Sequence, residues 1–126
     1  MRKSGDIGKA GEMAVCCYLE ERGCHILARN YRIQGGEIDI IAVDGEELLF
    51  VEVKSRRRGA MVSGYEAVTE RKKKFLIRAA MQYCTEHVID LQPRFDVAAV
   101  CMLKGQIQEI DYLKNAFDLS DYDSIF

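Results

Sequence analysis

Hydrophobic positions along the chain repeat with two periods, and these periods predict seven secondary-structure elements. Residues 7–22 and 67–87 carry apolar side chains three and four positions apart, which predicts helices with one buried face. Five short apolar or alternating runs, separated by turn residues, predict strands at 24–33, 36–43, 48–54, 94–103 and 106–112. The order α-βββ-α-ββ predicts an α/β or α+β fold in which helices flank a mixed β-sheet.

The two middle strands of this order are apolar on both of their alternating faces, which predicts strands that are covered on both sides. Three charged residues nevertheless stand in them, namely Asp39, Glu52 and Lys54. An ionised carboxylate in such a place costs several kcal/mol unless it is paired, hydrogen-bonded or bound to a metal ion. These residues are therefore the first candidates for a functional site.

The turn between the two strands decides whether the charges meet. Glu52 and Lys54 are two residues apart, so they project to the same side of a strand. If Asp44 and Gly45 form a two-residue type I′ loop, Asp39 lies opposite Phe50 and diagonal to Glu52, roughly 7–8 Å away. Two carboxylates at that separation can reach one divalent cation. A three-residue loop would turn Asp39 to the other face.

A purely structural interpretation is also open. Glu52 and Lys54 could form an ion pair at a strand end, with Asp39 bonded to backbone amides. Glu12, which borders the apolar stripe of the first helix, could likewise be an ordinary exposed acid or lie at the rim of the site.

Length and composition place few limits on function. A chain of 126 residues fits one domain, and we expect a core domain over residues 1–112 followed by an acidic tail over residues 113–126. No apolar run approaches the ~20 residues of a membrane span, and the first residues lack a secretory signal, so we expect a cytoplasmic protein without a membrane partner. Five cysteines without a C-x-x-C pair are expected to be small core residues.

Charge is distributed unevenly along the chain. The stretch from Lys54 to Arg78 contains nine basic side chains and two acidic ones, whereas residues 109–126 contain five acidic side chains and one lysine. The basic stretch begins directly after the strand that carries Glu52, which suggests a surface that contacts a polyanion around the candidate site. A charge run of this kind is also typical of a solvated face. The tail aromatics Phe117, Tyr122 and Phe126 are expected to be exposed, and they suggest a docking segment for a protein partner as a third reading.

Six groups of residues between positions 5 and 100 form a recognisable set: Gly8, Gly11, Glu12 and Ala14; Arg29 to Arg32; Gly36 to Asp39; Phe50 to Lys54; Gly64, Glu66 to Thr69 and Lys72; and Arg94 to Val97. In these groups the sequence closely resembles the bacterial YraN-like family. That family is similar to the Holliday-junction-resolvase-like branch of the restriction-endonuclease-like PD-(D/E)xK nucleases. Ile38 stands where the nominal motif has proline, a departure that removes no catalytic atom.

The resemblance implies roles for individual residues in a metal-dependent nuclease. It puts a metal-binding aspartate at Asp39, a second acidic ligand at Glu52, the catalytic lysine at Lys54 and a helix acid at Glu12. We expect Mg²⁺, or Mn²⁺ in its place, to be held by Asp39, Glu52 and the Val53 carbonyl. Phosphates of a nucleic acid, expected to be DNA with branched DNA as one candidate, would be gripped by basic side chains: Arg56, Arg57, Arg58, Lys72, Lys73 and Lys74. An alternative hypothesis is a nucleic-acid-binding module without turnover. A homodimer that cuts two strands is a further expectation.

Overall fold

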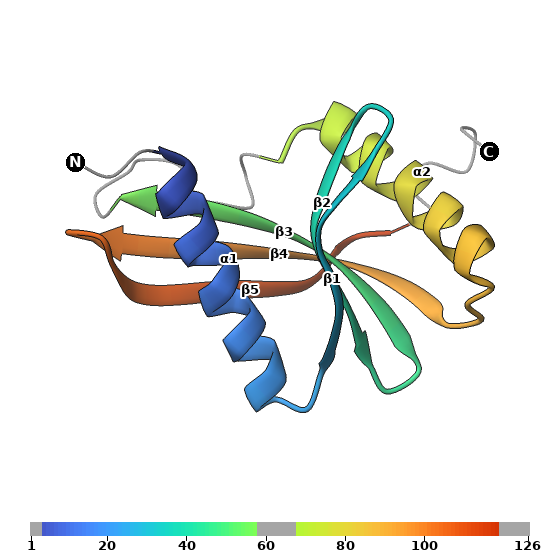
Figure 1. The fold of residues 1–126 in the computed structure, drawn as a ribbon, viewed down its shortest axis with the longest axis horizontal. Helices are drawn as coiled ribbons and strands as arrows, with labels where there is room; N and C mark the ends of the chain where they lie inside the picture. The colour runs from blue at the N-terminus through green and yellow to red at the C-terminus, as the bar shows by residue number, and fades with distance from the viewer. Residues whose placement is uncertain (1–3, 58–67, 119–126) are drawn as a thin grey trace.

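The computed structural model describes residues 4–57 and 68–118, without the side chains of residues 4–7 and 57. Its elements follow the predicted order (Figure 1). In chain order the elements are α1 (Ser4–Glu21), β1 (His25–Ile33), β2 (Gly36–Asp44), β3 (Glu47–Arg57), α2 (Glu70–His87), β4 (Gln92–Leu103) and β5 (Gln106–Phe117). Residues 58–67, which follow β3, and the tail residues 119–126 lie outside the described residues.

Local backbone conformation and hydrogen bonds set the end of α1 and the start of α2. After α1, Gly23 takes a left-handed φ of +87°, and Cys24 donates its N–H to the Leu19 carbonyl at 3.0 Å. Glycine adopts this conformation without strain, so it ends the helix as predicted. At the start of α2 the hydroxyl of Thr69 accepts a hydrogen bond from the Lys72 N–H at 3.1 Å. This N-cap fixes Lys72 in the first turn of the helix.

The five strands form one sheet in the order β1-β2-β3-β4-β5. Neighbouring strands are antiparallel except β3 and β4, which are parallel and are joined through α2. A parallel pair needs such a crossover, which is why a helix separates the two groups of strands. The prediction of a mixed sheet flanked by helices is confirmed. β5 runs past its predicted end at residue 112, so residues 113–117, which we had assigned to the tail, belong to the sheet.

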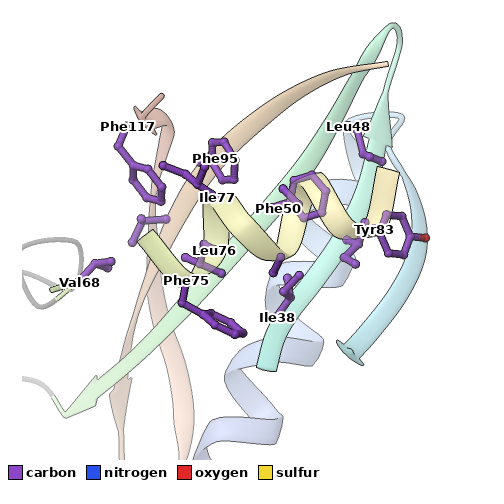
Figure 2. Packing of buried hydrophobic residues seen from close by; sticks show 14 residues of the cluster. Ile38, Leu48, Phe50, Val68, Phe75, Leu76, Ile77, Tyr83, Phe95 and Phe117 are labelled. Atoms are coloured by element: carbon purple, nitrogen blue, oxygen red, sulfur yellow. The ribbon is translucent and has the colours of Figure 1, made fainter. Parts of the chain in front are cut away.

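Each helix covers one face of the sheet with its own apolar core. On one side Val15 and Leu19 of α1 pack against alternating residues of β2, β3 and β4. On the other side the buried face of α2 packs against Phe50 and Phe95, and Phe117 at the end of β5 joins this cluster (Figure 2). Phe117 is 5% exposed and stacks on Phe95 with ring centroids 5.1 Å apart. The expectation that Phe117 is an exposed docking residue is wrong, because it completes the core.

The sheet is twisted at one point of β2. Ile38 and Ile41 belong to the core under α2, whereas Ile40 belongs to the core under α1, so the strict alternation of faces is broken around Asp39. Asn30 of β1, which lies across from Asp39 between the pairs Arg29–Ile40 and Tyr31–Ile38, has a left-handed φ of +51°. Figure 1 shows the β1–β2 hairpin crossing the direction of β3, β4 and β5 steeply. Asp39 therefore stands where the two faces meet.

The fold is that of a restriction-endonuclease-like mixed sheet between two helices. In the described part of the chain, neither helix has the length and apolar character that crossing a membrane requires.

Candidate functional site

The β2–β3 turn sets the register that brings the acids together. Asp44 pairs with Glu47, so the loop consists of Gly45 and Glu46 and lies one residue later than predicted. Gly45 has a φ of +61°, while Glu46 does not take a positive φ. This is the type II′ pattern, in which glycine occupies the first central position, instead of the predicted type I′ pattern. A two-residue loop preserves the predicted face, and continuing the register by one pair places Asp39 directly opposite Glu52 instead of diagonal to it.

The half-buried Asp39 and the buried Glu52 form a pair of carboxyl groups. The Val53 N–H donates to Oδ2 of Asp39 at 2.8 Å, and Glu52 is only 4% exposed. Burial, followed by the hydrogen bond with Glu52 and its negative charge, raises the pKa of Asp39 to about 8, while the Val53 N–H and the charge of Lys72 act in the opposite direction. In the absence of a cation, Asp39 therefore holds a proton at neutral pH and shares it with Glu52 only as a hydrogen-bond donor.

Two lysines face this pair from different elements. Nζ of Lys54 in β3 lies 3.9 Å from Oε2 of Glu52, and Nζ of Lys72 in α2 lies 3.6 Å from the same oxygen. Lys72 also donates to the backbone carbonyl of Glu37 at 3.1 Å. The expectation that Lys54 projects beside Glu52 is confirmed, and Lys72 is the basic residue of α2 that reaches the site.

A second group of acids adjoins Asp39. One carboxylate oxygen from each of Glu12, Glu37 and Asp39 can be chosen so that all three lie within 4.8 Å of one another. Asn30 holds two of these groups, because its Nδ2 donates to Oε1 of Glu12 and to Oε1 of Glu37 at 2.9 Å each. Burial raises the pKa of Glu12, the Asn30 hydrogen bond lowers it, and the charges of Asp39 and Glu37 raise it further. Glu12 thus belongs to the site rather than to an independent surface.

Sequence reasoning missed Glu37 and Asn30. Glu37 precedes Asp39 by two residues, so strand alternation alone could have indicated it. Asn30 stands among the family-like residues 29–32 but was given no role in the site, although asparagine is one of the few residues that tolerate a left-handed backbone. In β1 it has a φ of +51°, and its amide contacts the carboxylates of Glu12 and Glu37.

A close helix–strand approach positions Glu12. Gly11 faces Ser55 of β3 so closely that a Cβ atom on Gly11 would overlap the Ser55 hydroxyl. A side chain at position 11 would force the Ser55 hydroxyl to move, so glycine permits this close approach of α1 without a rearrangement, and Glu12 is the next residue along the helix. On the opposite side of the sheet, Gly36 abuts Phe75 of α2, where a Cβ atom would come within 2.9 Å of Phe75 Cζ. These two contacts fix both helices relative to the acids.

The predicted phosphate-binding residues do not all gather at the site. Lys72 faces the acids, whereas Lys73 pairs with Glu70 at 3.3 Å and lies over the ring of Phe117. Lys74 is exposed. Arg56 is half-buried, and within the described parts of the chain its Nε has no hydrogen-bond partner. The side chain of Arg57 and all of Arg58 lie outside the described residues, as do the tail residues Tyr122 and Phe126.

The donor atoms fit a hard divalent cation. Asp39, Glu52, Glu37 and Glu12 offer carboxylate oxygens, which Mg²⁺ and Mn²⁺ prefer over softer ligands. Asp39 lies in both groups of acids, so a cation bound by it could take a second ligand from either. Val53 contributes its N–H to Asp39, and a role for its carbonyl stays a prediction.

Comparison with known proteins gives a consistent result. Residues 11–100 match the family described as "Uncharacterised protein family UPF0102". Similar bacterial proteins, each described as "UPF0102 protein", come from Geotalea uraniireducens, with 38% identity over 90% of this chain and 91% of the relative, and from Chlorobium chlorochromatii, with 41% over 89% and 91%. A third, from a Synechococcus strain, is 42% identical over 90% of this chain and 92% of its own length. The matched range contains every acid of the site and both lysines.

Proposed function

The chain belongs to the UPF0102 family, the YraN-like family that its motifs resemble, and from the geometry of the site we propose that it is a metal-dependent nuclease that hydrolyses phosphodiester bonds. One observation carries this proposal. The half-buried Asp39 and the buried Glu52 face each other on neighbouring strands, with Lys54 and Lys72 beside them, at the positions where the resemblance implies two metal-binding acids and the catalytic lysine.

The acids would hold the cation and set its charge environment. Asp39 and Glu52 would supply ligands from neighbouring strands, and Glu12 would either complete the first ion's environment or hold a second ion. When bound, Mg²⁺ or Mn²⁺ would polarise the scissile phosphate and lower the pKa of a bound water molecule. Releasing the proton shared by Asp39 and Glu52 makes both carboxylates available, and hence we expect metal affinity to rise with pH.

The lysines would act on the substrate rather than on the metal. Lys54 is one-third exposed, so its ammonium group can leave Glu52 and neutralise charge that develops on the phosphate, or orient the attacking water. Lys72 is tied to the Glu37 carbonyl and can contact a neighbouring phosphate oxygen. The exposed basic residues of α2 would then grip the nucleic acid backbone without reading its sequence.

A second candidate is a nucleic-acid-binding module without turnover. It is favoured by the groups already present, because the Val53 N–H, the shared proton and the two lysines offset part of the charge of the acids without a cation. Calorimetric titration with Mg²⁺ and Mn²⁺ separates the two functions, since only the nuclease requires binding at millimolar concentration or below.

The decisive experiment is a cleavage assay with Mn²⁺ and a panel of labelled substrates: branched, nicked, duplex and single-stranded DNA, and RNA. The control is Asp39→Asn combined with Glu52→Gln, purified in the same way. We expect cleavage by the natural protein and none by the control. Equal cleavage by both would identify a contaminating nuclease and contradict the proposal, as would a complete lack of cleavage together with a lack of metal binding.

A further inference from the structure

A pocket of about 300 Å³ lies between the β1–β2 turn and α2, on a surface that the acidic site does not use. Its apolar lining comes from Ile33, Phe75 and Ala79, and its polar lining from Gln34, Arg78 and Gln82. The pocket thus combines apolar side chains with a guanidinium group and two carboxamides. Such groups offer both hydrogen-bond donors and acceptors to a flat, polar-edged ligand.

The pocket adjoins the acidic site through the first turns of α2. Nζ of Lys72 lies 5.2 Å from the centre of the Phe75 ring, and the same nitrogen lies 3.6 Å from Oε2 of Glu52. Phe75 in turn lines the pocket and packs against Gly36 at the start of β2. A chain whose phosphate contacts Lys72 therefore has the pocket within reach of its adjacent units.

Unpaired positive charge borders the pocket. Arg71, Lys74 and Arg78 are exposed and follow one another at helical spacings of three and four residues, so they share one side of α2. Within residues 4–57 and 68–118 none of the three has an ion-pair partner, in contrast to Lys72 and Lys73. A polyanion laid along this side of α2 would neutralise them.

These three observations agree on one ligand class. Resting on the nuclease function above, we propose that the pocket receives one unpaired nucleobase of the substrate strand whose phosphate lies at the acidic site. The base edge would hydrogen-bond to Gln34 and Gln82, and the Arg78 guanidinium would pack against the ring. The favoured substrate then has an unstacked base beside the cut, as in a single strand or a branch, because extracting a base from intact duplex costs unstacking energy.

The test measures binding of labelled single-stranded oligonucleotides by fluorescence anisotropy without divalent metal. One series carries a single abasic site, moved along the strand. For the natural protein we expect an abasic site at one position to weaken binding by about 5- to 150-fold, the range typical of losing one stacked base, and at other positions much less. A free mononucleotide should compete only weakly, because it lacks the backbone contacts.

Two variants locate the effect. Arg78→Ala combined with Gln82→Ala removes exposed side chains, and this variant should bind the intact strand as weakly as the natural protein binds the abasic one, with no further abasic penalty. Lys74→Ala is the matched control, because it removes one exposed charge of the same helix outside the pocket. It should weaken both strands equally and keep the penalty.

The outcomes separate the two proposals. If the natural protein binds but no abasic position matters, or if the double variant keeps the full penalty, the pocket inference is wrong while the nuclease proposal stands. Competition by a free mononucleotide as strong as that by the strand would also overturn it. If the natural protein binds no nucleic acid, both proposals fail.

Discussion

Two aspartates in this fold, the half-buried Asp39 and the buried Asp96, each face an asparagine with a left-handed backbone in a neighbouring strand, yet their surroundings differ. Asp39 lies across from Asn30, and Asp96 accepts a hydrogen bond from the Asn115 N–H at 2.9 Å. Asp96, 1% exposed, also accepts from Nε and Nη2 of Arg94 at 2.8 to 3.2 Å and from the hydroxyl of Tyr112. Its charge is compensated by a bidentate partner and two further donors.

Asp39 has much poorer compensation. Its hydrogen-bond partners are the Val53 N–H and the carboxyl group of Glu52, and the two lysines stand 3.6 and 3.9 Å from Glu52. A carboxylate with a structural role has short hydrogen bonds to all of its oxygen atoms, whereas a carboxylate that binds a cation must keep negative charge available. The contrast indicates that Asp96 holds the sheet together and that Asp39 is retained at a cost in stability.

The largest effect should come from breaking the saturated network. Arg94→Met leaves the Asp96 charge buried and removes the bonds from Arg94 to Glu47 at 2.9 Å and to Asp44 at 3.4 Å. We expect the free energy of unfolding to fall by about 3–5 kcal/mol, as for other broken buried pairs. Urea denaturation followed by circular dichroism measures it. Adding Asp96→Asn should recover part of the loss, and a single variant as stable as the natural protein would show that Arg94 is dispensable.

The variant Asp39→Asn is expected to raise the free energy of unfolding, the opposite of the effect of Arg94→Met. The asparagine resembles the protonated aspartate, because its oxygen can accept from the Val53 N–H and its amide can donate to Glu52. At pH 7 the unfolded chain no longer gains from ionising this residue, so we expect stability to increase by about 1–3 kcal/mol. Metal binding and cleavage should be lost. Destabilisation in the same urea assay would mean that Asp39 is a structural acid like Asp96.

Because Asp39 holds this proton only in the folded protein at neutral pH, we expect the stability of the protein to depend on pH. The pKa of Asp39 is about 8 in the folded protein and near 4 when unfolded, so the folded state binds more protons between these values. The contribution of protonated Asp39 to the stability of the fold is complete below about pH 4 and is lost as the pH rises through 8. The limiting slope is about 1.4 kcal/mol per pH unit. The difference in stability between the natural protein and Asp39→Asn should therefore widen from pH 4 to pH 8, and a constant difference would exclude the shared proton.

The sequence predicted the elements better than the contacts between them. Periodicity and turn residues indicated all seven elements, and strand alternation correctly placed Glu52 beside Lys54. The parallel pairing of β3 with β4 could not be read from local patterns, because it depends on the path of α2. The broken alternation at Asp39 was equally hidden, since it arises from the left-handed Asn30 in the adjacent strand. Phe117 showed only hydrophobicity, which does not distinguish a core residue from an exposed one.

The smallest effect on stability, and the sharpest comparison, comes from the two asparagines. Glycine accepts a φ near +50° without strain, so Asn30→Gly and Asn115→Gly both preserve the backbone. Asn115 acts through its backbone N–H, which glycine keeps, whereas Asn30 acts through its side-chain amide on Glu12 and Glu37. We expect both variants to lie within about 1 kcal/mol of the natural stability.

We expect the two asparagine variants to differ in cation binding. Without the Asn30 amide the repulsion between Glu12 and Glu37 is no longer offset, so the two carboxylates would move apart and the site would be less preorganised. We expect Asn30→Gly to lower Mn²⁺ affinity, measured by calorimetry, by about tenfold, and Asn115→Gly to leave it unchanged. Equal affinities for the two variants would show that the second group of acids does not contribute to cation binding, and would confine the metal to Asp39 and Glu52.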